Sequence, residues 1–93
     1  MTPREISEKR IKLAEEYSRL SSEYATLIKI QADFFVAQRE NHKSDTATEK
    51  AFDRTEDGIQ MTTTKLRLKA IEKEMSAYNT HLRLLENEAK NVY

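Results

Sequence analysis

The side chains that could carry chemistry in this 93-residue chain are few, and their spacing favours no reaction. Neither His42 nor His81 has a Glu or Asp three residues before it, as a di-metal site in a helical bundle would require. The absence of cysteine excludes a thiol nucleophile, a Cys-ligated zinc site and a disulfide framework. We therefore expect no metal and no cofactor, and we interpret both histidines as ordinary polar residues.

Nucleophilic and acid–base chemistry is equally poorly supported. The serines of the N-terminal half have no histidine nearby in sequence, and a single glycine cannot make a Gly-rich phosphate loop. Neighbouring carboxylates, such as those of Glu15 and Glu16, have the pattern of a solvated helix face. We predict no catalytic residues and expect that the protein is not an enzyme.

A basic stretch at 65–73 is the one charged feature that could bind a ligand. It contains Lys65, Arg67, Lys69 and Lys73, with no acidic residue between positions 65 and 71. The stretch could contact phosphates, or it could pair with acidic residues of another helix or subunit. The 16 basic and 16 acidic residues give no net charge, which argues against a dedicated nucleic-acid binder.

The composition is typical of long helices. Of the 93 residues, 45 are Ala, Glu, Lys, Leu or Arg, and there is only one Gly and one Pro. The longest apolar run, Phe34 to Ala37, is far too short to cross a bilayer. The N-terminal MTPREISEKR is not followed by the apolar stretch of a secretory signal. We expect one cytoplasmic, all-α domain over residues 1–93 that does not enter a membrane.

The first helix is predicted from about residue 3 to about residue 40. Thr2, Pro3 and Glu5 form a capping box, with Thr2 as the N-cap. Apolar residues then recur at every seventh position and define one coiled-coil seam. They are Ile6, Leu13, Leu20, Leu27 and Phe34.

A second helix is predicted from about residue 46 to about residue 91, after a polar loop at 41–45. A second capping box starts at Thr46, and the seam carries Met61, Leu68, Met75 and Leu82, with a companion line through Ile71. We favour a helix that is continuous through Gly58. The alternative is a break near Gly58, with a short helix over 46–57.

The two seams match as an antiparallel hairpin. Facing residues of such a pair have numbers with a constant sum, and Leu13 with Met75, Leu20 with Leu68 and their neighbours all give 88. Half of 88 is 44, inside the predicted loop. A shift by a whole heptad would also match, and a straight rod about 130 Å long is the other alternative.

The pairing becomes ambiguous near the loop. With the sum of 88, Phe34 would face Arg54 and the neighbouring layers would be polar. A second ladder of Phe52, Ile59 and Leu66 instead gives 86 with Phe34 and the residues below it. A local shift in register would reconcile the two patterns.

Two helices side by side cannot cover all the apolar residues of this chain. We therefore predict self-association into a helical bundle, as a dimer in the simplest case, or coverage by another protein. We expect these contacts near the loop and at the C-terminal end, which overhangs the first helix. The candidates are Ile28, Phe34, Phe35, Phe52, Ile59, Leu66, Leu85, Val92 and Tyr93.

The last third of the chain, KLRLKAIEKEMSAYNTHLRLLENEAKNVY, resembles the tails of small helical accessory proteins of bacteriophages and mobile elements. The resemblance implies a small cytoplasmic protein that binds a host or phage protein. Our first hypothesis is a non-enzymatic interaction module, an assembly factor or an inhibitor of a larger protein, that docks through helix faces. The second is a nucleic-acid-associated accessory factor that uses the basic stretch.

Overall fold

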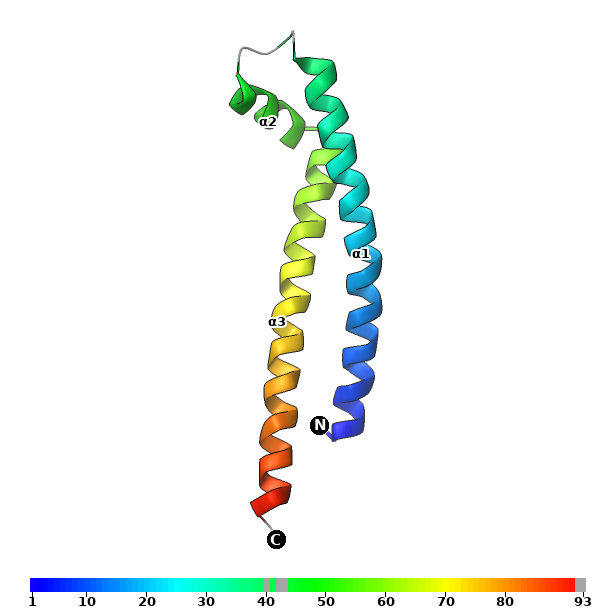
Figure 1. The fold of residues 1–93 in the computed structure, drawn as a ribbon, viewed down its shortest axis with the longest axis vertical. Helices are drawn as coiled ribbons and strands as arrows, with labels where there is room; N and C mark the ends of the chain where they lie inside the picture. Colours follow the sequence, from blue (N-terminus) through cyan, green and yellow to red (C-terminus); the bar gives the residue numbers. More distant parts are fainter. Residues whose placement is uncertain (40, 42–43, 92–93) are drawn as a thin grey trace.

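The protein is an all-α helical hairpin, as the sequence predicts (Figure 1). The computed structural model describes residues 1–39, 41 and 44–91, and these form α1 (Pro3–Gln38), α2 (Asp45–Asp53) and α3 (Glu56–Asn91). The molecule measures 70 × 20 × 15 Å, a cross-section of about two helices. Its radius of gyration is 19.9 Å, against about 12 Å for a globular chain of this length. The straight-rod alternative is therefore wrong.

α1 begins at the predicted cap. Thr2 has an extended backbone, and its hydroxyl accepts a 3.2 Å hydrogen bond from the backbone N–H of Glu5. Four of the five predicted seam residues are buried, while Phe34 is half-buried near the end of the helix. The buried ones are Ile6, Leu13, Leu20 and Leu27.

α1 and α3 run side by side in opposite directions (Figure 1). The central cluster contains both members of three pairs predicted by the sum of 88. On α3 the companion line faces α1 most directly, since Ile71 is 1% exposed while Met75 and Leu68 are half-buried. The cluster consists of Leu13, Leu20 and Ile71, with Tyr17, Leu68, Met75 and Tyr78 packed against it.

The continuous second helix is wrong, and the chain instead breaks near Gly58 after a short helix, as in the alternative. The chain leaves the helix at Arg54 and Thr55, three residues before the glycine. The N-cap of α2 is Ser44, whose hydroxyl accepts from the N–H of Ala47, and not the predicted Thr46. The helix starts earlier because Ser44 offers its side chain to the first free N–H groups.

Thr55 links α2 to α3. Its hydroxyl donates to the carbonyl oxygen of Phe52 at 2.6 Å and accepts from the N–H of Gly58 at 3.0 Å. One side chain thus satisfies a carbonyl at the end of α2 and an N–H at the start of α3. The acidic residues Glu56 and Asp57 follow it in the first turn of α3, where the helix dipole favours negative charge.

Gly58 is required by a close approach of backbones. A Cβ atom at this position would lie 2.0 Å from the carbonyl oxygen of Phe52 and 2.8 Å from the Cα of Asp53. The first turn of α3 packs directly on the last turn of α2, and only a residue without a side chain fits there.

The break lets α2 fold against the end of α1. Phe52 is 1% exposed, and its ring meets that of Phe34 edge-to-face, with centroids 5.4 Å apart. The numbers of these two residues add to 86. The second ladder therefore describes the pairing at the tip, where α2 packs on the end of α1, while the sum of 88 describes the shaft, where α1 and α3 lie side by side. The shift in register is made by the helix break rather than by a stutter.

Candidate interaction surfaces

The predicted interface residues separate into internal and external ones. Phe52 lies inside the tip and packs on the half-buried Phe34, so this aromatic pair holds α2 in place, while Phe35 is half-buried on α1. Leu85 is half-buried near the C-terminal end, and Val92 and Tyr93 lie outside the described residues. The predicted tip surface is therefore smaller than the sequence suggested.

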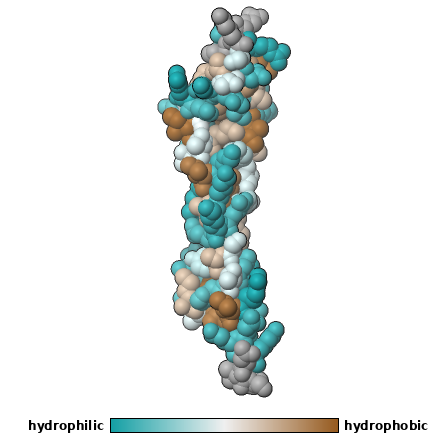
Figure 2. Space-filling model, turned by 90° about the vertical axis from the view of Figure 1, so that its left-hand side faces the viewer, coloured by the Kyte–Doolittle hydropathy of each residue, from teal (hydrophilic) through white to brown (hydrophobic). Residues whose placement is uncertain are grey.

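Ile59 and Leu66 are the external members of the same ladder. They are 58% and 62% exposed and lie seven residues apart, on one face of α3. The side of the molecule in Figure 2 carries its apolar side chains as separate patches among hydrophilic ones. Because α2 is a separate helix, Phe52 is buried in the core while Ile59 and Leu66 of the same ladder lie on the surface of α3.

α1 has its own exposed apolar residues. Ile28, a predicted contact, is 45% exposed, and Ile11, which is not among the predicted contacts, is 59% exposed. Between them the helix carries small side chains, and an open groove of about 850 Å³ runs there between α1 and α3. The groove is lined from α1 by Ala14, Tyr17, Ser18, Ser21, Ser22 and Ala25, and from α3 by Ile71, Glu72, Met75 and Ser76.

Sequence reasoning missed this groove because it considered these serines only as nucleophiles. The signal was present in their spacing, since small residues recur three and four positions apart beside the apolar seam. Small side chains next to a helix pair leave a channel in which another helix can approach closely.

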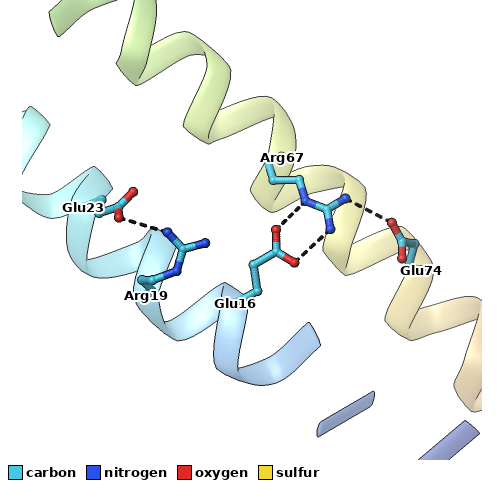
Figure 3. A network of polar contacts seen from close by, with 5 residues as sticks. All are labelled: Glu16, Arg19, Glu23, Arg67 and Glu74. Carbon is cyan, nitrogen blue, oxygen red and sulfur yellow. Dashed lines mark hydrogen bonds and ion pairs between the residues drawn. The ribbon is translucent and has the colours of Figure 1, made fainter. Parts of the chain in front are cut away.

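Arg67 belongs to an ion-pair network and not to an open basic patch (Figure 3). Its guanidinium binds both oxygens of Glu16, at 2.7 and 2.9 Å, and also reaches Glu74 at 3.2 Å. The hydrogen bond to Glu16 raises the pKa of the arginine and lowers that of the carboxyl group. Because Glu16 lies on α1, this is the pairing with the first helix that the sequence offered as one reading.

The lysines of the basic stretch differ from Arg67. Lys65, Lys69 and Lys73 are all exposed, and no ion pair of theirs is found in the part of the chain that the structure describes. Lys69 and Lys73 flank Glu72 along a shallow depression. Three separate ammonium groups, two of them beside the Glu72 carboxylate, make a weak anion site.

A second polar link between the helices lies beside the groove. The Tyr17 hydroxyl donates to the carboxylate of Glu72 at 2.7 Å. This hydrogen bond and the nearby negative charge raise the pKa of the Tyr17 phenol. Tyr17 packs its ring against the central cluster while its hydroxyl reaches the surface.

Among residues 1–39, 41 and 44–91 there is no cluster of three metal-ligating side chains. His81 is exposed on α3, and His42 lies outside the described residues. No described helix is long and apolar enough to span a membrane.

The chain was compared with models of protein families, with curated proteins and with solved structures. None of the three comparisons gives a match.

Proposed function

We propose that the chain is a non-enzymatic protein-interaction module, an assembly factor or an inhibitor, that docks through its helix faces. The observation that carries the proposal is the pair Ile59 and Leu66, each more than half exposed on one face of α3. A molecule only two helices thick has no layer to cover such residues. A partner helix laid on α3 would contact both, as apolar anchors seven residues apart do in helix-in-groove recognition.

The proposal includes self-association and a cytoplasmic site of action. The hairpin has a small core, and a second copy would enlarge the apolar area removed from water. The resemblance of residues 65–93 to phage accessory proteins agrees with such a role and adds no binding residue.

The test is capture of the partner in the cells that express the protein, by proximity labelling of the tagged chain. We expect the double variant Ile59→Asp/Leu66→Asp to lose the proteins labelled by the wild type. The matched control is Asn79→Asp/Asn87→Asp, which adds the same charge at exposed polar positions of α3 that lie farther along the helix. If both variants retain the same labelled proteins, the α3 face is not the docking surface.

A nucleic-acid role is the second candidate, because Lys65, Lys69 and Lys73 are exposed on one helix. Arg67 weakens this candidate, since Glu16 and Glu74 already neutralise it. Binding of a 30-mer duplex at low salt, lost on changing the three lysines to Glu with helix content intact, would support it. No binding at low salt would exclude it.

A further inference from the structure

The flank of α1 that borders the groove carries a stripe, here called the outer stripe, that follows coiled-coil spacing for most of the helix. Its positions are separated alternately by four and three residues, so they form one continuous line beside the seam that faces α3. All members are exposed except the half-buried Ser21. The outer stripe consists of Ser7, Ile11, Ala14, Ser18, Ser21, Ala25, Ile28 and Ala32.

The order of large and small side chains along the outer stripe is the same from either end. Pairing its members from the ends inward gives Ser7 with Ala32, Ile11 with Ile28, and small residues with small residues in the centre. The numbers of every pair add to 39. The stripe is thus symmetric in side-chain size about a point between residues 19 and 20.

We infer that the outer stripe binds a second copy of itself, with the two α1 helices antiparallel about a twofold axis at residues 19 and 20. This inference rests on the proposed function and names the partner of one face. A twofold interface requires a surface that is complementary to itself. In an antiparallel pair of identical helices, the residues that face each other also have numbers with a constant sum. The symmetry of the stripe meets both conditions with the same sum.

The sizes of the side chains agree with this arrangement. Each Ile11 lies against Ile28 of the second copy, so the two large exposed side chains of the stripe cover one another at both ends. In the centre, Ala14, Ser18 and Ala25 allow the two backbones to approach closely. The second α1 then lies along the groove between α1 and α3 and covers it.

The charges beside the outer stripe are complementary as well. Glu8 and Lys29 are exposed and flank the stripe on the same side, and their numbers add to 37, within two of the stripe's sum. In the antiparallel pair, Glu8 of each copy meets Lys29 of the other, which gives two ion pairs. Glu8 also contacts Arg4 of its own helix at 3.4 Å, with both side chains well exposed, and so stays available to a partner.

Cysteine crosslinking tests the register, because the chain has no cysteine of its own. A mixture of the Ile11→Cys and Ile28→Cys proteins is expected to form mixed disulfide dimers on mild oxidation, at least tenfold faster than either protein alone. In the antiparallel pair, two copies of position 11 are separated by about 25 Å along the axis, at 1.5 Å per residue. Faster dimerisation of the single-variant proteins than of the mixture would indicate a parallel pair and overturn the inference.

Light scattering over a concentration series tests the face independently. We expect a dimer, and an increase of about a hundredfold in its dissociation constant with Ile11→Asp/Ile28→Asp. Glu8→Lys and Lys29→Glu should each weaken the dimer, and the combined charge swap should restore it. Thr62→Asp/Asn79→Asp on α3 is the control and should leave the mass unchanged.

The outcomes separate this inference from the proposed function. A folded monomer at high concentration, or a dimer insensitive to the Ile11 and Ile28 changes, overturns the self-docking of α1 and leaves docking on α3 untouched. If Ile59→Asp/Leu66→Asp leaves the labelled proteins unchanged while the dimer and its crosslinks still form, the proposed function is overturned and this inference stands.

Discussion

The shaft and the tip of the hairpin solve the same packing problem differently. In the shaft, the seven-residue repeats of α1 and α3 match, and two uninterrupted helices bury Leu13, Leu20 and Ile71 between them. At the tip the matching positions are polar, and the chain leaves the helix at Thr55 to turn Phe52 onto Phe34. A helix is interrupted where breaking it buries more apolar surface than continuing it would.

The largest expected loss of stability comes from truncating a buried side chain in the shaft or at the tip. Ile71→Ala truncates the most buried side chain of the central cluster and should lower the free energy of unfolding by about 3 kcal/mol. Phe52→Ala should cost a similar amount, but it should release α2 alone and leave the shaft folded. Hydrogen exchange would show loss of protection along α1 and α3 in the first variant and only in residues 45–58 in the second. If Phe52→Ala unfolds the shaft as well, the two regions form one cooperative unit.

Gly58→Ala is expected to destabilise the protein by about 1–3 kcal/mol, because the new Cβ meets the carbonyl oxygen of Phe52. The sign is diagnostic, since Gly to Ala in an ordinary helix interior stabilises by about 1 kcal/mol. Thermal unfolding measures the change, with Thr62→Ala as the control at an exposed position of the same helix. A raised melting temperature for Gly58→Ala would mean that α3 continues into α2 without the close approach.

Thr55→Val should cost about 1 kcal/mol, the typical value of a lost helix cap. The substitution keeps the shape of the side chain but removes both the bond to Phe52 and the bond from Gly58. Thr63→Val is the comparison, because its exposed hydroxyl bonds only to the preceding turn of its own helix. Equal unfolding midpoints in urea for the two variants would show that the Thr55 hydroxyl does not stabilise the helix break.

The smallest effects concern the polar links of the shaft, and they depend on pH. The pKa of Tyr17 is raised by its bond to Glu72, so this link stabilises the fold below pH 10 and is lost as the pH rises through the raised value. The pKa of Glu16 is lowered by Arg67, so that link is present above about pH 4.5 and is lost as the pH falls through the lowered value.

Melting temperatures from pH 2 to 12 would measure both links. Tyr17→Phe should flatten the alkaline side of the profile, and Glu16→Gln the acidic side. Tyr24→Phe, which keeps the bond from Tyr17 to Glu72, should follow the wild type on both sides. A Tyr17→Phe profile that also follows the wild type would mean that the bond does not contribute to stability.

Much of the shaft could be predicted from the sequence because it is repetitive. Thr2, the ladder from Ile6 to Leu27 and the pairing of Leu20 with Leu68 depend on local capping and on a period that the two helices share. The partly buried Arg67, by contrast, was left between two interpretations, because its pairing with Glu16 depends on which face of α3 lies beside α1.

Composition, the heptad repeats and the Thr2 cap specify the helical state, the start of α1 and the faces that each long helix buries. Tertiary contacts decide where the second helix breaks and which member of the Phe52, Ile59 and Leu66 ladder is buried. The reason is that a heptad repeat defines faces but not the end of their pairing. That end depends on whether α2 can reach Phe34, and the contact requires the approach of two backbones at Gly58, which no local pattern encodes.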